Sequence, residues 1–420
     1  MIIRKSSLIL IWNAIAIALL TGACNSLLSS GSLNRSGGNI LYQFTTLLFL
    51  LPGVIQLFRL EPQKLRRVFQ GKTTFFVLLL WALFSVVWAH QPLVSLRRWI
   101  SLLIGCFYAL YLVSFFHPKE LHRLFTVASL LILGLTFLSI LAGVGFHHGD
   151  EHAGALRGFA GHKNNLGQVL GVTTVILYVH FYFQKNFKTA LLLFISCGFL
   201  ILTQSKTSLV VFIIAIMSLY MFLYQQGLGF RYRNNRRTRS AIIFLGILAC
   251  ILMVFVSYTY VLDAIGRDLT FSGRNKIWAY ALNVDSISNL WGAGYRNFWI
   301  DYHTWDFFIF NPYWGGEKVT ANGHSGYLDI YLEIGVVGTI LFGAFIIDYF
   351  KKCISRRLTL NNVQHFHLIS AAMLSFNVVY NIFETAFLSS RLDIAWFALL
   401  VSYFFCSTQS NYSRESDNER

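Results

Sequence analysis

Three polar segments of the chain carry residue types that could do chemistry, and each lies beside an apolar run. In the first, LRGFAGHKNNLG, five polar residues precede such a run: Arg157, His162, Lys163, Asn164 and Asn165. Cations and amide donors gathered at the N-terminal end of a helix suit a phosphate or diphosphate, because the free backbone amides of the helix point the same way. A capped helix end with interfacial anchors is the alternative interpretation.

The second segment, TFSGRNKIWAYAL, places Arg274 behind a Ser-Gly turn that opens a predicted helix near residues 275–285. A guanidinium group in that position can hold an anion at the membrane surface through two parallel hydrogen bonds. The alternative is an ordinary solvated arginine of a loop.

The third segment, ANGHSGYLDIYLEIGVV, begins close to His324. This histidine could act as a general base, because an imidazole takes up and releases a proton near neutral pH; a satisfied interfacial histidine is the alternative. Asp329 and Glu333 are four residues apart and share one face of the helix that follows. Because acidic residues at membrane depth normally face protein or water, we expect this helix to line a wet cavity.

These segments are positioned by a chain whose composition predicts a polytopic membrane protein. Of its 420 residues, 55% are hydrophobic and 12% charged, and the apolar residues form runs close to the roughly 20 helical residues of one bilayer crossing. We expect an all-α fold of about 12 transmembrane helices in a single integral membrane domain, residues 1–420. The predicted spans lie near residues 8–28, 40–58, 73–89, 99–116, 124–144, 165–183, 189–204, 207–224, 241–261, 326–349, 366–383 and 391–406.

Two outward-facing segments are too polar to be simple connectors: residues 145–164 and the long loop 262–325 before the tenth predicted helix. Loops of this length are usually functional.

The polar residues 407–420 predict a disordered cytoplasmic tail. The first 24 residues are interpreted as a transmembrane helix rather than a cleaved signal. All six cysteines fall in predicted spans or inner segments, which indicates no disulfide.

The net charge of +16 is explained by membrane sidedness rather than by nucleic acid. Lys and Arg are retained on the cytoplasmic side of a membrane. With the N-terminus inside, most of the 34 Lys and Arg residues fall in cytoplasmic segments, where they can contact anionic lipid heads. Both termini are therefore predicted to be cytoplasmic, and the three chemical segments to lie on the other side.

Other candidates carry a weaker signal. HHGDEH, residues 147–152, could hold a divalent ion, but its ligands crowd into one loop without helical spacing, and we expect no metal site. Lys206 lies between two spans and either snorkels to the surface or adds positive charge to the cavity. Arg97 and Arg98 are predicted interfacial anchors.

In combination, FAGHKNNLG, SKTSLV, SGRNKIW, LWGAGYRNFW and NGHSGYLDIYLEIGVVG resemble the superfamily of O-antigen ligases, O-antigen polymerases and exopolysaccharide polymerases. The resemblance spans about residues 155 to 345 and is closest to the exopolysaccharide-polymerase branch, through the HKN–LG, SKT and G-Y-x-x-F-W elements. It implies a bacterial inner-membrane enzyme of the GT-C type, with a periplasmic active site and no cofactor or metal. Such enzymes transfer a glycan from undecaprenyl diphosphate to an acceptor hydroxyl.

By this resemblance, Arg157 and Arg274 match the arginines that hold the diphosphate, with Lys163 and His162 as supporters, and His324 matches the proposed base. Ser325 stands where many members have Asn. Further candidates for glycan or cavity contacts are Lys206, Tyr295, Phe298, Trp299, Tyr327, Asp329 and Glu333. The aromatic members of this set either stack on sugar faces or anchor the loop at the interface.

The resulting hypothesis is a glycosyltransferase that polymerises lipid-linked repeat units in exopolysaccharide or O-antigen synthesis. Its expected partners are the undecaprenyl-diphosphate-linked donor, a glycan acceptor and the bilayer, with other polysaccharide-assembly proteins as further candidates. An O-antigen ligase that moves glycan to lipid A core or to protein is the related alternative. A transporter or flippase, suggested by Asp329 and Glu333, and a structural component of an assembly complex are alternatives of other classes.

Overall fold

The described part of the chain is helical in the computed structural model. It comprises residues 7–20, 22–28, 40–148, 152–226, 274–283, 290–300, 322–355, 365–390 and 392–418. Within these ranges there is no β-strand, and extended backbone pairs only in an isolated bridge between Phe146 and Leu156. The predicted all-α fold class is confirmed for these residues.

The helices follow one another with short connections wherever the described chain is continuous. In chain order they are α1 (Ser7–Leu20), α2 (Asn25–Leu28), α3 (Ile40–Phe58), α4 (Pro62–Phe69), α5 (Thr73–Phe84), η1 (Ser85–Trp88), α6 (Pro92–Phe115), α7 (Pro118–Leu141), η2 (Gly158–Ala160), α8 (Lys163–Gln184), α9 (Phe187–Leu202), α10 (Lys206–Gln225), α12 (Arg274–Leu282), η4 (Phe298–Ile300), α14 (Gly326–Ser355), α15 (His365–Phe383) and α16 (Ile394–Asn418).

Seven of the described helices are long and apolar enough to cross a bilayer, or eight if α4 and residues Thr73–Trp88, bent by 86°, form one broken span. The prediction of about 12 spans is not reached in the described residues. The apolar helices Ser7–Leu19, Phe187–Leu202 and Ile394–Thr408 are shorter than a full crossing normally requires. The predicted span at 241–261 lies outside the described residues.

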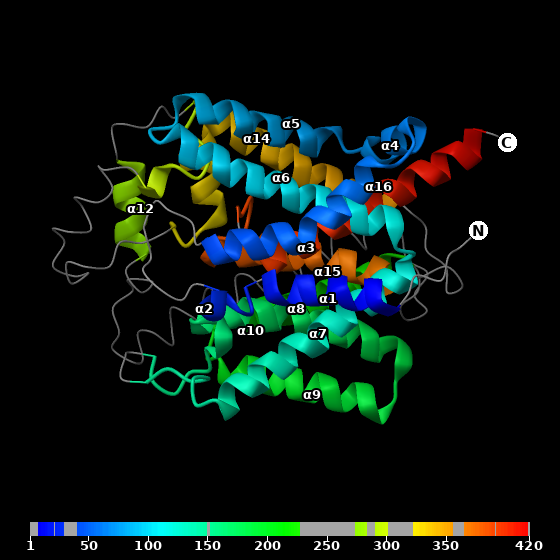
Figure 1. Ribbon diagram of the computed structural model, residues 1–420, viewed down its shortest axis with the longest axis vertical. Helices are drawn as coiled ribbons and strands as arrows, with labels where there is room; N and C mark the ends of the chain where they lie inside the picture. Colours follow the sequence, from blue (N-terminus) through cyan, green and yellow to red (C-terminus); the bar gives the residue numbers. More distant parts are fainter. Residues whose placement is uncertain are drawn as a thin grey trace.

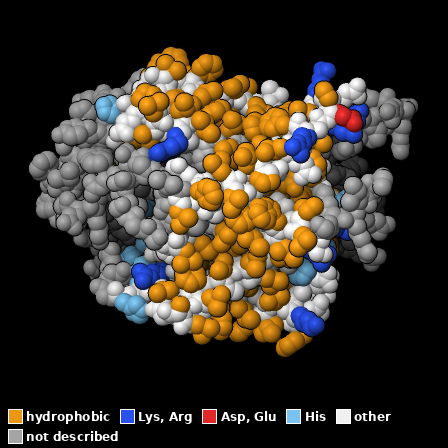
Figure 2. Space-filling view, in the orientation of Figure 1, with side chains coloured by type: hydrophobic (Ala, Val, Ile, Leu, Met, Phe, Trp, Pro, Cys, Tyr) orange, Lys and Arg blue, Asp and Glu red, His pale blue; other side chains and the backbone are white. Residues whose placement is uncertain are grey.

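The outer surface is what a lipid-facing protein requires. In Figure 2, hydrophobic side chains form a broad band across the molecule, with Lys and Arg side chains toward both edges of the band. Leu8, Phe44, Phe194 and Ile340 are among the exposed apolar residues. Exposed apolar surface on this scale indicates contact with lipid rather than water, so the chain is a multi-pass membrane protein.

The interior is organised around α15, which packs against α7, α8, α10, α14 and α16 (Figure 1). Two asparagines of α15 bind backbone groups outside their own helix. Asn377 donates from Nδ2 to the Ala395 carbonyl at 2.9 Å. Asn381 accepts through Oδ1 from the amides of Ala386 (2.7 Å) and Phe387 (2.9 Å). The turn that follows α15 is thereby fixed to the core.

α14 is broken at Gly335, whose φ of 69° lies in the left-handed region that favours glycine. A Cβ at this position would lie 2.3 Å from the Leu290 carbonyl oxygen, so the loop before η4 approaches the break directly. Carbonyls released by a break need new donors inside a membrane protein. They find them outside the helix: Leu332 accepts from the Ala293 amide (2.9 Å), Glu333 from the Gly294 amide (2.8 Å) and Ile334 from the Trp81 indole (2.9 Å).

The two ends of the helix bundle differ in what they carry. Figure 1 shows α12 and the start of α14 at one end, and the start of α1 and the end of α16 at the other. α16 continues as helix through residues 407–418, where a disordered tail was predicted. Once a helix has nucleated, each added residue gains a backbone hydrogen bond, so a polar stretch can extend it.

Candidate active site

Glu384 joins the segments that carry the candidate catalytic residues. Its Oε1 lies 2.7 Å from Nη2 of Arg274 and accepts a hydrogen bond from Nδ2 of Asn164 at 3.0 Å. Its Oε2 lies 3.2 Å from Nδ1 of His324. One carboxylate therefore connects the first turn of α8, the first residue of α12 and the loop before α14. Two of the predicted site residues, Arg274 and His324, are brought together in this way.

The three groups differ in their access to solvent. The side chains of Glu384 and Arg274 are 10% and 16% exposed, whereas that of His324 is 35% exposed. Burial raises the pKa of the Glu384 carboxyl, but the hydrogen bond with His324 and the charge of Arg274 outweigh this, and the pKa lies below its ordinary value. Glu384 is therefore an anion at neutral pH, while His324 is the member that an incoming molecule can reach.

The backbone at His324 is held in an unusual conformation. Its φ is 50°, in the left-handed region that costs a non-glycine residue about 1–3 kcal/mol unless the surroundings impose it. The amide of His324 donates to Oδ1 of Asn322 at 3.0 Å, and the indole of Trp278 on α12 donates to the Gly323 carbonyl at 2.7 Å. The conformation is thus imposed by contacts of the two residues that precede the histidine and of its own amide.

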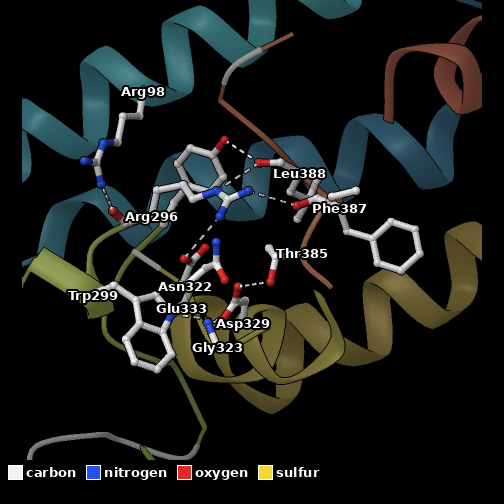
Figure 3. A network of polar contacts seen from close by, with 12 residues as sticks. Arg98, Arg296, Trp299, Asn322, Gly323, Asp329, Glu333, Thr385, Phe387 and Leu388 are labelled. Carbon is white, nitrogen blue, oxygen red and sulfur yellow. Dashed lines mark hydrogen bonds and ion pairs between the residues drawn. The ribbon is translucent and has the colours of Figure 1, made fainter. Parts of the chain in front are cut away.

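Asp329 holds the same loop through three hydrogen bonds. Its Oδ1 accepts from the Trp299 indole at 2.8 Å and from the Gly323 amide at 2.9 Å, and its Oδ2 accepts from the Thr385 hydroxyl at 2.7 Å (Figure 3). Thr385 follows Glu384 directly in the chain. This single buried carboxylate therefore fixes the loop of His324 relative to the turn of Glu384.

Glu333 belongs to a second contact between the same segments. Its Oε1 lies 3.9 Å from Nη1 of Arg296, whose Nη2 donates to the Phe387 carbonyl at 3.2 Å (Figure 3). Arg98, predicted to be an interfacial anchor, donates to the Arg296 carbonyl. Arg296 was not among the predicted site residues, and it ties the loop before η4 to the turn after α15.

The predicted wet cavity beside Asp329 and Glu333 is corrected by these contacts. The two residues do share one helix face, but they are only 2% and 5% exposed and face protein. Helical periodicity gives the residues of a face and not what covers it. Here the face is covered by the loop before η4 and by the turn after α15, which come from distant parts of the chain.

Sugar stacking and interfacial anchoring were the two alternatives for Tyr295, Phe298 and Trp299, and their burial does not favour stacking. Their exposed fractions are 0%, 2% and 6%, so no ring offers a free face to a sugar. The hydroxyl of Tyr295 donates to the Leu388 carbonyl at 2.8 Å, and the Trp299 indole serves Asp329. These aromatic residues support the site from within the core.

The first sequence motif reaches the site through Asn164 rather than through Arg157. Nε of Arg157 donates to the Val144 carbonyl at 3.3 Å, and the residue is partly exposed next to η2. Lys163, also partly exposed, is the first residue of α8. His162 precedes α8 and accepts the Asn164 amide through Nδ1 at 3.2 Å, which leaves the proton of its neutral ring on Nε2.

His162 also belongs to a group of three imidazoles with His147 and His152, whose ring centroids lie 5.5–5.7 Å apart. Burial and these two neighbours lower the pKa of His162, so it is a neutral hydrogen-bonding group near pH 7 and not a cation. Among the described residues, no group of three or more His, Cys, Asp or Glu side chains could hold a metal ion. Residues 149–151 of the HHGDEH segment lie outside them.

The remaining predicted contacts lie outside the Glu384 cluster. Tyr327, in the first turn of α14, is partly exposed and donates its hydroxyl to the Val378 carbonyl of α15 at 2.8 Å, so it fixes one helix to the other. Lys206 is exposed at the first residue of α10.

Sequence reasoning missed Glu384 and its neighbour Thr385. The signal was present in NIFETAF, where a single acidic residue ends an apolar run. An ionisable residue at the end of a membrane helix is a candidate functional residue by the same argument that singled out Asp329 and Glu333.

Two comparisons with known proteins show what the chain resembles. The family model described as O-Antigen ligase matches residues 191–343, a range that includes Arg274 and His324. The exopolysaccharide production protein ExoQ of Rhizobium meliloti (strain 1021) is 25% identical over 300 residues, 68% of this chain and 66% of its own length. The chain thus spans just under two thirds of that relative. The resemblance predicted from the motifs, to the superfamily of O-antigen ligases, O-antigen polymerases and exopolysaccharide polymerases, is confirmed.

Proposed function

We propose that this chain is a glycosyltransferase of the bacterial inner membrane. It moves a glycan from undecaprenyl diphosphate to an acceptor hydroxyl on the periplasmic side, and so joins lipid-linked units into a polysaccharide. The observation that carries this proposal is the meeting of Arg274 and His324, from separate segments, at Glu384. A cation for the leaving group and a base for the acceptor lie within reach of one carboxylate.

Arg274 is the proposed binder of the donor diphosphate. A guanidinium group matches phosphate oxygens through paired hydrogen bonds and stabilises the charge that develops as the bond to the anomeric carbon breaks. Arg157 and Lys163 are proposed to add positive charge from the neighbouring loop and the start of α8. Two or more such cations supply the stabilisation that other enzymes obtain from a divalent ion, which is why we propose that the reaction is independent of metal.

His324 is the proposed general base. When Nδ1 carries the proton of the neutral ring and donates a hydrogen bond to Glu384, Nε2 has the free lone pair. Nε2 can then accept the hydroxyl proton of the acceptor sugar. As that proton moves to Nε2, the hydroxyl oxygen forms the new glycosidic bond and undecaprenyl diphosphate leaves. The greater exposure of His324 within the cluster favours this role over one for Glu384.

The arrangement of the two ends of the bundle supports a periplasmic site. The cluster lies at the end opposite to the start of α1 and the end of α16 (Figure 1). If the sidedness of Lys and Arg keeps both termini in the cytoplasm, the cluster faces the periplasm. A transporter is less well supported, because Asp329 and Glu333 are engaged within the protein and do not form a path of accessible ionisable groups.

The test uses purified full-length protein in liposomes with an undecaprenyl-diphosphate-linked oligosaccharide. Longer lipid-linked products indicate a polymerase, and transfer only to added lipid A core indicates the ligase alternative suggested by the matching family. His324→Ala should abolish either product at normal protein level, whereas His148→Ala, a change at an exposed histidine of the 145–164 segment, should not. Full activity of His324→Ala would reject the base assignment, and movement of substrate without bond formation would reject the enzyme.

A further inference from the structure

Glu384 is shared between two groups that have different tasks in the proposed reaction. Oε1 serves Arg274 and Asn164, and Oε2 serves His324. In the arrangement described here the proposed diphosphate binder is therefore already paired with an anion of the protein. A donor diphosphate that binds Nη2 of Arg274 displaces this carboxylate from the guanidinium.

The competition favours the donor. A diphosphate carries more negative charge than a carboxylate and offers more oxygens in the geometry that a guanidinium fork matches. The present pair is largely buried, with side chains 16% and 10% exposed, so neither charge can be left without a partner. The diphosphate supplies a new anion to Arg274, and this new contact compensates for the loss of the Arg274–Glu384 contact.

Glu384 does not become isolated when Arg274 changes partner. It remains within 3.2 Å of His324 and 3.0 Å of Asn164. Among the described residues, His162 before α8 and Tyr380 on α15 also interact with its charge, and neither is a cation near neutral pH. Lys163, the residue before Asn164, is a cation, but no ion pair joins it to Glu384 among the described contacts. The full charge of the carboxylate then acts on the imidazole.

We propose that Glu384 is a positioning residue that changes partner when the donor binds, from Arg274 and His324 together to His324 alone. This proposal rests on the proposed function. Before the exchange, the carboxylate is shared between the guanidinium of Arg274 and the imidazole. After the exchange, the carboxylate stabilises the imidazolium that forms when the acceptor hydroxyl is deprotonated, so the base becomes effective only when a donor is in place.

The coupling makes occupation of Arg274 by the donor a condition for the activity of His324. Asn164 keeps the Glu384 carboxylate in register during the exchange, because its hydrogen bond to Oε1 does not depend on the donor.

The first experiment measures binding alone, with farnesyl diphosphate as the probe and the purified full-length protein in detergent. Glu384→Gln removes the competing charge, so it should bind the probe about fivefold more tightly than the wild type, the ratio that corresponds to about 1 kcal/mol. A residue that only supports the fold would give the opposite sign when removed. Glu61→Gln, at the exposed carboxylate before α4, is the matched control and should leave the affinity unchanged. Unchanged or weaker binding by Glu384→Gln would overturn the proposal.

The second experiment measures the pH dependence of the wild-type enzyme, so its main result does not depend on the folding of a variant. In wild-type protein, the loss of kcat on acidification reports the donor-bound enzyme, and the loss of kcat/KM reports the free enzyme. We call these two parts of the pH–rate profiles the acidic limbs. The acidic limb of kcat should lie at higher pH, because the carboxylate then acts on the base without Arg274. In Glu384→Gln the two limbs should move closer together, and kcat should fall about 10²-fold or more. Coincident limbs in the wild type would contradict the exchange.

The two proposals fail separately. If the wild-type protein transfers no glycan, the proposed function is wrong, and the binding experiment still decides whether Glu384 competes for Arg274. If the wild type transfers glycan but Glu384→Gln shows neither tighter binding nor a changed separation of limbs, only the exchange is wrong.

Discussion

The substitution Asp329→Ala tests whether the loop of His324 is held in place by the contacts described above. Asp329 is 2% exposed and accepts three hydrogen bonds, from Trp299, Gly323 and Thr385. Alanine removes all three acceptors and leaves three donors in the interior without them. The loop of His324 and the turn of Glu384 then lose their common anchor.

The magnitude follows from the number and kind of bonds. A hydrogen bond to a charged group contributes about 1.5–3 kcal/mol, and removal of one partner from a buried charged contact typically costs about 3–5 kcal/mol in total. We expect Asp329→Ala to lower the free energy of unfolding by about 3–5 kcal/mol. A displacement of about 1 Å at a catalytic group can cost about 10²-fold in rate, so turnover per folded molecule should fall by 10- to 100-fold as an order of magnitude.

The assay combines thermal unfolding in detergent with glycan transfer normalised to folded protein. Asp348→Ala is the matched control, because Asp348 lies on the same helix and its Oδ2 also has three partners: the hydroxyl groups of Thr74 and Tyr403 and the ammonium group of Lys352. The control should lose stability but keep its turnover, since these contacts are not made with the loop of His324 or the turn of Glu384. Normal turnover of folded Asp329→Ala would refute this role of Asp329.

Three further predictions concern single positions. Arg274→Lys keeps the charge but loses the guanidinium fork, so glycan transfer should fall about 10²-fold, and an unchanged rate would argue against paired hydrogen bonds to the diphosphate. Gly335→Ala places a Cβ 2.3 Å from a backbone oxygen at a positive φ and should destabilise the fold by at least about 2 kcal/mol in a denaturation assay; Gly343→Ala, where the added Cβ meets nothing within 4 Å, should not. Burial raises the pKa of Asp393 to about 6, above its ordinary value, so its charged form costs stability as pH rises through that range. Asp393→Asn should therefore raise Tm at pH 8, with a gain that shrinks toward pH 4, and a gain independent of pH would contradict this assignment.

Sequence patterns predicted the helices well because a bilayer crossing is a local property. A run of apolar residues is visible without knowledge of the rest of the chain, and α3, α6, α7, α8 and α10 lie where such runs were found. The number of spans was less predictable. Whether a short apolar helix such as α9 crosses the bilayer depends on its tilt and on its neighbours, which hydropathy does not contain.

The break in α14 shows a similar limit. Its apolar run continues through Gly335, so hydropathy predicts one uninterrupted span. The break becomes possible because Ala293 and Gly294 supply amides to the freed carbonyls. Those donors lie some forty residues earlier in the chain. A contact between residues so far apart leaves no trace in the local sequence pattern.

The sequence by itself determined which chemistry is available: a guanidinium at Arg274 and an imidazole at His324, each placed beside a predicted helix by its own local segment. Only the tertiary structure decided that they act on one group. Glu384 lies 60 residues beyond His324 and 110 beyond Arg274. Charge and residue type are properties of a position, whereas a shared partner is a property of how α12, α14 and α15 pack.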